Sequence, residues 1–376
     1  MKIVKFFLIA VFILNMCASV FAEEPEIKSR SAVLIDADSG RVLWGLDPEN
    51  PMPMASTTKI MTCIYTIENC DLEDEVVVSK NAASAPKVKL FLSEGERVRL
   101  KDLLYALMLR SSNDAAVAIA EHVSGTSEEF CKALTKKAAL IGAKDTVFET
   151  PNGLDSGNHH STALDMALIT RYALKNETFR EIIKTPAYSF SSDKRSYSLT
   201  NADRLLTEYS GAIGVKTGYT GKAGHCFVGA AERDGMTLIS VVLASGWGAQ
   251  GKAAKWSDTK AILNYGFDNF HIEEVVKKGD PAGEFEIFKG EKPKGEAVFG
   301  ESLSLPLKEG EETELKISFD TLNAPAAVGD EVGMCEVSLD GKVIKRIKLL
   351  SAEDIEEHSF ERFFNDIFNS WLNMCQ

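Results

Sequence analysis

The sequence pattern predicts the first turns of a buried helix in the segment Pro53-Met54-Ala55-Ser56-Thr57-Thr58-Lys59-Ile60-Met61-Thr62. Residues three apart share one face of a helix, so we expect Ser56 and Lys59 to touch. A hydroxyl beside an amine becomes a nucleophile when the amine is neutral, and burial lowers the pKa of a lysine in the required direction. An ordinary serine at a helix start is the alternative for Ser56, since the same Ser-x-x-Lys spacing recurs at Ser84, Ser191 and Ser257.

Residues 1–22 have the features of an export signal. Lys2 and Lys5 precede an apolar run from Phe6 to Leu14, and Val20-Phe21-Ala22 offers a small-residue cleavage site. The run is too short to span a bilayer as a helix, so we expect cleavage after Ala22 and an exported chain.

The chain of 376 residues is acidic, with a formal charge of −13 that becomes −15 when Lys2 and Lys5 are lost with the signal. Such a chain is not expected to bind nucleic acid, which needs clustered cations to displace counterions. Six cysteines are scattered over residues 23–376 without short paired spacings, which favours buried free thiols. No Cys/His spacing is typical of zinc, and neither a metal nor a cofactor is expected.

The order of the expected elements predicts an α+β catalytic domain over residues 23–272. A strand hairpin comes first, amphipathic helices follow, and a strand meander and a closing helix complete the domain. This order implies an antiparallel sheet built from both ends of the domain, with an inserted helical subdomain. The expected segments are the hairpin at 31–44, helices at 102–110, 115–123, 128–141, 162–174 and 256–267, and strands at 188–200, 214–220, 225–231 and 237–244.

Two further segments complete the chain. Residues 273–350 contain short strands separated by Gly, Pro and charged residues, which predicts a small all-β domain. Residues 351–376 are predicted to form an amphipathic helix, because apolar side chains recur there at three- and four-residue steps: Phe360, Phe363, Phe364, Ile367, Phe368, Trp371 and Leu372. That helix fits either a membrane surface or a docked position on the protein.

Two other clusters of polar residues can contribute to a site with Ser56 and Lys59. Ser111 and Asn113 lie where one predicted helix ends and the next begins, although Ser111 could simply cap the second helix. Lys216-Thr217-Gly218 begins a predicted strand, where Lys216 could instead be a lysine that protects a sheet edge. The order of the three clusters, each on a suitable element, argues against coincidence.

These motifs resemble those of the low-molecular-mass penicillin-binding proteins, the D-alanyl-D-alanine carboxypeptidases of the serine DD-peptidase and β-lactamase superfamily. The resemblance covers residues 31–267, and the β-domain and tail also resemble the C-terminal half of the family. Its motifs are Ala55-Ser-Thr-Thr-Lys-Ile-Met-Thr62, Leu109-Arg-Ser-Ser-Asn-Asp-Ala-Ala116, Pro151-Asn-Gly-Leu-Asp155, His160-Ser-Thr-Ala-Leu-Asp-Met166 and Gly214-Val-Lys-Thr-Gly-Tyr-Thr220.

The resemblance implies roles for the residues of the first motif and the strand. Ser56 would attack the carbonyl of the penultimate D-Ala, and Lys59 would take its proton. The backbone N–H groups of Ser56 and Tyr219 would form an oxyanion hole. An acyl-enzyme would form, terminal D-Ala would leave, and water would then release the trimmed peptide.

The resemblance also implies roles for the remaining motif residues. Ser111 would relay a proton to the leaving amine, Asn113 would hold the substrate amide, and Lys216 and Thr217 would bind the terminal carboxylate. The charge of Lys216 would also keep Lys59 neutral. Two departures from the family pattern bear on substrate preference: Ser112 replaces the commoner glycine, and the run 212–214 lacks the aspartate that is often found there.

The implied partners are peptidoglycan stem peptides ending in D-Ala-D-Ala and, as covalent inhibitors, β-lactam antibiotics. The implied location is the outer face of the cytoplasmic membrane, with contact through the C-terminal helix. Three other functions stay open: a DD-endopeptidase, a scaffold with an inactive site, and a β-lactamase. The last needs a deacylating base, and residues 149–155 carry carboxylates without the Glu-x-x-x-Asn pattern of class A enzymes.

Overall fold

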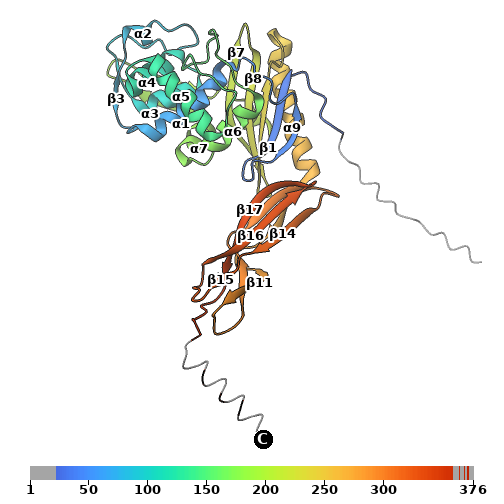
Figure 1. Cartoon of the computed structure of the whole chain (residues 1–376). Helices are drawn as coiled ribbons and strands as arrows, with labels where there is room; N and C mark the ends of the chain where they lie inside the picture. Colours follow the sequence, from blue (N-terminus) through green and yellow to red (C-terminus); the bar gives the residue numbers. More distant parts are fainter. Residues whose placement is uncertain (1–22, 359–363, 365–367, 369–370, 372–376) are drawn as a thin grey trace, which may run out of the picture.

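The computed structural model describes residues 23–358 together with Phe364, Phe368 and Trp371. A larger unit of helices and sheet comes first along the chain, and a smaller all-β unit extends from it (Figure 1). This arrangement confirms the predicted α+β class with a following β-domain.

A five-stranded antiparallel sheet joins the two ends of the first unit, in the order β2-β1-β9-β8-β7. Its strands are β1 (Ser31–Asp36), β2 (Val42–Leu46), β7 (Ala212–Thr220), β8 (Gly224–Arg233) and β9 (Met236–Leu243). The predicted hairpin pairs with the late strands because β1 lies beside β9. Every residue of β1 and β9 is buried, since helices cover both faces of the sheet.

One face of the sheet is covered by the closing helix α9 (Gly248–Asn269), which packs on β8 and β9. The helix begins eight residues before its predicted start at Trp256, in a glycine-containing stretch whose composition gave no helical signal. Its contact with the sheet is close: a Cβ at Gly266 would lie 2.5 Å from Leu238 Cδ1.

The other face carries the helical block, with α1 (Lys59–Asn69) at its centre. Around α1 lie α3 (Leu100–Leu109), α4 (Asn113–Ser124), α5 (Ser127–Ile141) and α6 (Ala163–Ala173). These four helices confirm the predicted ones, with ends shifted by one or two residues. The smaller elements are β3 (Glu75–Val77), α2 (Lys80–Ala83), β4 (Arg97–Arg99), α7 (Glu177–Lys184), β5 (Ala187–Ser191), β6 (Ser196–Thr200) and α8 (Leu205–Glu208).

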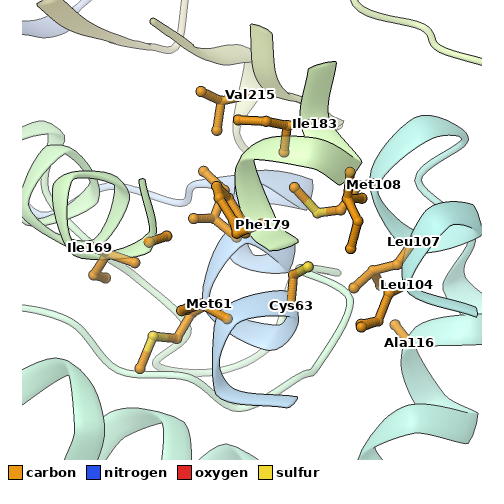
Figure 2. Packing of buried hydrophobic residues seen from close by; sticks show 14 of the residues in the cluster. Met61, Cys63, Leu104, Leu107, Met108, Ala116, Ile169, Phe179, Ile183 and Val215 are labelled. Carbon is orange, nitrogen blue, oxygen red and sulfur yellow. The ribbon is translucent and has the colours of Figure 1, made fainter. Parts of the chain in front are cut away.

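Apolar side chains from several helices meet around α1. Figure 2 shows Met61 and Cys63 of α1 near Phe179 of α7 and Leu104 of α3. Phe179 is fully buried, and replacing a buried phenylalanine by alanine typically costs about 3–5 kcal/mol. The helix that begins beside Ser56 is therefore held from all sides.

The second unit starts directly after α9, at Phe270, three residues before the predicted boundary. Strands β10 (Phe270–Val276) and β13 (Leu303–Lys308) pair with each other. A six-stranded sheet follows the order β14-β16-β17-β12-β11-β15. Its strands are β11 (Pro281–Phe288), β12 (Lys294–Phe299), β14 (Thr313–Phe319), β15 (Leu322–Asn323), β16 (Glu331–Leu339) and β17 (Lys342–Ser351).

The helix predicted for residues 351–376 does not begin where the sequence pattern placed it. Residues 351–358 are not helical: Ser351 ends β17, Ala352 and Glu353 form a bend, and the fully buried Ile355 pairs with Ala326 of the β-domain. The prediction was wrong for these eight residues because they pair with the β-domain, and the repeating aromatic residues begin only at Phe360. The rest of the expected helix lies outside the described residues, apart from the exposed side chains of Phe364, Phe368 and Trp371.

The predicted export signal, residues 1–22, also lies outside the described residues. Within the described part of the chain, no helix combines the length and the apolar character that crossing a bilayer requires. The export signal therefore stays a prediction, as does the part of the C-terminal helix that lies outside the described residues.

Arg41, in the turn between β1 and β2, joins the two units. Its guanidinium donates to the backbone oxygen of Pro306 and to the carboxylate of Glu311, and it lies 5.5 Å from the centre of the Phe270 ring. Glu311 also accepts a hydrogen bond of 2.8 Å from Lys308 N. Both charged side chains are largely shielded from water, which strengthens their attraction.

Replacing Arg41 by alanine is expected to loosen the contact between the two units without reducing hydrolysis of a small peptide. The loss removes hydrogen bonds to a charged group, each worth about 1.5–3 kcal/mol. Small-angle scattering should show a broader distribution of shapes for Arg41→Ala. Glu312→Ala removes an exposed neighbour of Glu311 and should leave the scattering unchanged; equal broadening in both variants would contradict the assignment.

Candidate active site

Ser56 lies in a short 3₁₀ turn, η1 (Ala55–Thr58), that runs directly into α1. In a 3₁₀ turn, side chains at i and i+3 are aligned, which brings Ser56 above Lys59. Lys59 Nζ lies 3.0 Å from Ser56 Oγ, as the spacing predicts. The tighter turn differs from the α-helix expected for these residues.

Lys59 is fully buried and surrounded by oxygen acceptors. Besides Ser56, its Nζ contacts Asn113 Oδ1 at 2.9 Å and the backbone oxygen of Asn152 at 2.5 Å. The orientation of the Asn113 amide follows from its other end, since Nδ2 donates to the backbone oxygens of Pro86 and Lys87 at 3.2 and 3.1 Å. Asn113 therefore presents an acceptor, not a donor, to the lysine.

The environment holds the pKa of Lys59 well below its ordinary value. Burial is the main cause and the charge of Lys216 the second, while Asp114 opposes them. A neutral amine has two N–H groups and one lone pair. The two N–H groups match Asn113 Oδ1 and Asn152 O, which leaves the lone pair for the hydroxyl of Ser56. The geometry is that of a general base beside a nucleophile.

The loop after α5 supplies the third contact of Lys59 and packs tightly on η1. Gly153 has φ +81°, and a Cβ there would lie 2.0 Å from the backbone oxygen of Ala55, so only glycine fits. His159 fixes the same loop: its Nδ1 accepts from Glu149 N at 2.9 Å, so its Nε2–H donates to Thr58 Oγ1 at 2.9 Å.

Strand β7, at the edge of the sheet, forms the opposite wall of the site. A Cβ at Gly218 would lie 3.0 Å from Ser56 N, so the strand passes directly beside the candidate nucleophile. Lys216 is buried, and its Nζ donates to Thr217 O at 3.0 Å. Thr217 is partly exposed and Tyr219 half-exposed beside it.

Ser111 occupies the turn between α3 and α4 with φ +61°, an uncommon conformation for a residue other than glycine. Ser112, not Ser111, is the N-cap residue of α4, and it makes no capping hydrogen bond. The capping alternative for Ser111 is therefore wrong. The Oγ of Ser111 makes no hydrogen bond to any residue that the structure describes, so it is free to meet a ligand.

The structure thus joins Ser56, Lys59 and Asn113 directly and places the β7 residues beside them. Sequence reasoning assigned no role to Asn152 or His159, although both lie within or next to motifs that it quoted. The only hint in the sequence was the turn-forming run Pro151-Asn152-Gly153, which indicates a tight loop there but not that its backbone contacts Lys59. Across the described ranges, no group of three or more His, Cys, Asp or Glu side chains is placed to bind a metal ion.

A family model described as D-alanyl-D-alanine carboxypeptidase matches residues 18–246, more than half of the chain. The chain belongs to this family. A second model, the C-terminal domain of penicillin-binding protein 5, matches residues 270–357. The family makes the protein a serine-type D-Ala-D-Ala carboxypeptidase, a penicillin-binding protein of cell-wall metabolism.

Individual relatives agree with the family match over most of the chain. The D-alanyl-D-alanine carboxypeptidase DacF of Bacillus subtilis is 31% identical, and the alignment covers 98% of each chain. The crystal structure of penicillin-binding protein 5 from Haemophilus influenzae matches with a TM-score of 0.76 at 29% identity, over 89% of this chain and 99% of that one. The DD-transpeptidase of Streptomyces K15 matches 65% of this chain at 32% identity, with a TM-score of 0.61.

The buried His159 is expected to make the folded protein less stable as the pH is lowered. Burial, the main cause, lowers its pKa to about 4, whereas an unfolded histidine titrates near 6.5. Between these values the unfolded state binds more protons, so stability is complete above pH 6.5 and declines as pH falls toward 4. This single group should cost about 2 kcal/mol between pH 7 and pH 5.

Chemical denaturation of wild type and His159→Gln at both pH values measures this cost. The variant should lose about 2 kcal/mol less than wild type on acidification. His271→Gln, which changes an exposed histidine of β10, should behave like wild type. An equal loss in wild type and His159→Gln would contradict the assignment.

Proposed function

We propose that the protein is an exported carboxypeptidase that removes the terminal D-Ala from peptidoglycan stem peptides through an acyl-enzyme on Ser56. The observation that carries the proposal is the contact between Ser56 Oγ and the buried Nζ of Lys59, with both other acceptors of that nitrogen in place. Exported location is inferred from the leader pattern of residues 1–22.

In the first step, the lone pair of Lys59 takes the proton of Ser56 as Oγ bonds to the carbonyl carbon of the penultimate D-Ala. Backbone N–H groups of Ser56 and Tyr219 stabilise the negative oxygen, a contribution of about 3–4 kcal/mol per donor in comparable enzymes. The C–N bond then breaks, and the leaving amine takes the proton from Lys59, with Ser111 as the relay. Water hydrolyses the resulting ester by the same route in reverse, and the serine is regenerated.

The substrate has a suitable docking edge. Strand β7 is the last strand of the sheet, so a peptide can add to it as a further strand. Lys216 and Thr217 on this strand would bind the terminal carboxylate by charge and hydrogen bond. Asn113 binds the substrate amide only if its Nδ2 leaves the carbonyls of Pro86 and Lys87, so its main contribution is to position Lys59.

A β-lactamase needs a carboxylate placed to deacylate the enzyme, and the two in the loop beside Ser56, Glu149 and Asp155, are bonded elsewhere. Asp155 accepts from Thr220 Oγ1 at 2.7 Å, and Glu149 accepts from Asn158 N at 3.0 Å. Neither has a hydrogen bond to Ser56 or Lys59, so neither is placed to activate a deacylating water there. Penicillin should therefore form a lasting ester with Ser56.

A DD-endopeptidase would use the same residues as the carboxypeptidase. The proposed function does not depend on the membrane contact predicted for the C-terminal tail.

Mass spectrometry after incubation with fluorescent penicillin tests the proposal. Wild type should gain one penicillin mass, and Ser56→Ala should gain none because it lacks the attacking oxygen. Wild type should also release D-alanine from a peptide ending in D-Ala-D-Ala, and the variant should not. As a matched control, Thr57→Ser changes the neighbouring hydroxyl residue, which bonds only to Met54 O, and should still be acylated.

The absence of both the adduct and D-alanine release on wild type would overturn the proposal and favour the scaffold function. Rapid turnover of the drug would instead indicate a β-lactamase. The same samples can be tested on cross-linked stem peptides. Cleavage of the cross-link would show endopeptidase activity in addition to the proposed one.

A further inference from the structure

Asp203 is a buried carboxylate that the catalytic steps above do not use. Its side chain accepts two backbone hydrogen bonds, from Leu205 N at 2.8 Å to Oδ1 and from Val215 N at 3.1 Å to Oδ2. No ion pair joins it to any described residue. Removing a carboxylate from water costs free energy, and the two backbone hydrogen bonds offset that cost only in part. A polar or apolar residue at this position would avoid the cost, so the buried charge calls for an explanation.

The hydrogen bond to Val215 N places the carboxylate beside the backbone that leads into Lys216. Gly214 has φ +91°, and a Cβ there would lie 3.2 Å from Asp203 Oδ2. The approach is close because the strand has no side chain at this point. Asp203 therefore fixes the backbone of β7 one residue before the lysine that is to meet the substrate.

A second buried cation lies close enough to Lys216 to act on its charge. Lys255, on α9, is 6% exposed, and its ammonium lies 4.7 Å from the centre of the Trp256 ring. Neither Lys255 nor Lys216 forms an ion pair with a carboxylate in the described part of the chain. Two buried lysines near each other disfavour each other's charged form, and a nearby carboxylate favours both.

We propose that Asp203 is a positioning residue that keeps the Lys216 side chain protonated and correctly placed for the terminal carboxylate of the substrate, against the opposing charge of Lys255. The inference rests on the proposed role of Lys216 in substrate binding. It assigns Asp203 no contact with the substrate itself.

The electrostatic directions agree with this arrangement. The pKa of Lys216 is lowered to about 7, mainly by burial and then by the charge of Lys255, while Asp203 acts to raise it. The protonated fraction of Lys216 is therefore sensitive to both neighbours near neutral pH. The other titratable or charged groups that face this cluster are Lys59 on α1, Arg204 beside Asp203, His225 and Cys226 on β8, and Lys252 on α9.

Opposite shifts in the pH profile test the proposal. For each variant, kcat and KM for a D-Ala-D-Ala peptide are measured from about pH 6 to about pH 10, and kcat/KM reports ionisation in the free enzyme. Asp203→Asn should move the alkaline limb of kcat/KM to lower pH by about one unit, with the loss mainly in KM. Lys255→Met should move the limb to higher pH. The double variant should return toward the wild-type limb.

Two controls separate this role from a structural one. Asp203→Glu keeps the charge and should restore most of the wild-type pH profile, even if the altered reach lowers the thermal midpoint. Lys260→Met removes another α9 cation, one that pairs with Glu208, and should leave the limb unmoved.

An unmoved limb in Asp203→Asn, or shifts of both single variants in the same direction, would overturn the proposal. If Asp203→Asn does not fold, Lys255→Met decides, because a limb that stays or moves to lower pH contradicts the opposing charges. Failure of the proposed function is distinguishable, since wild type itself would then release no D-alanine.

Discussion

The burial of one amine, Lys59 Nζ, is the constraint on which the rest of the site depends. An ammonium ion enclosed without a carboxylate partner is costly, so burial favours the neutral amine. The neutral amine keeps two hydrogen bonds, to Asn113 and to the backbone of Asn152, and directs its lone pair at Ser56. Nucleophilicity of the serine is thus a consequence of packing.

Several elements distant in sequence enclose that amine. The turn η1 and helix α1 carry Ser56 and Lys59, the start of α4 carries Asn113, and the loop at 151–153 closes over them. Strand β7 passes against η1 because Gly218 has no side chain. Each contact needs a rigid support, which the sheet and the helical block supply. This explains why the Lys59 side chain has no path to bulk water in the folded protein.

The charged groups Lys216, Lys255 and Asp203 act on one another's pKa values, and Lys216 also acts on that of Lys59. Lys216 lowers the pKa of Lys59 and needs its own positive charge for that effect. Lys255 opposes the protonation of Lys216, and Asp203 supports it. The substrate carboxylate would add a second negative charge to a region that holds two buried lysines and one carboxylate. Binding and base strength are therefore coupled through Lys216.

Local patterns in the sequence predicted the helices, the first hairpin and the contact of Ser56 with Lys59, because those features depend on spacing along the chain. They could not predict the backbone oxygen of Asn152 as a partner of Lys59, since any residue has such an oxygen and only the loop conformation places it. Asp203 and Lys255 were missed because their proximity to Lys216 is tertiary. The helix predicted from residue 351 was wrong up to residue 358 because Ile355 is buried in the β-domain, and the repeating aromatic residues begin only at Phe360.

Measuring the ionisation of Lys59 tests most directly whether the buried amine is neutral. NMR titration of isotope-labelled lysine side chains, with the Lys59 signal assigned by its loss in Lys59→Arg, reports that ionisation in the free enzyme. We expect a pKa well below the ordinary value, so that the amine is neutral at a pH where exposed lysines are still charged. A Lys59 signal that titrates together with the exposed lysines would contradict it.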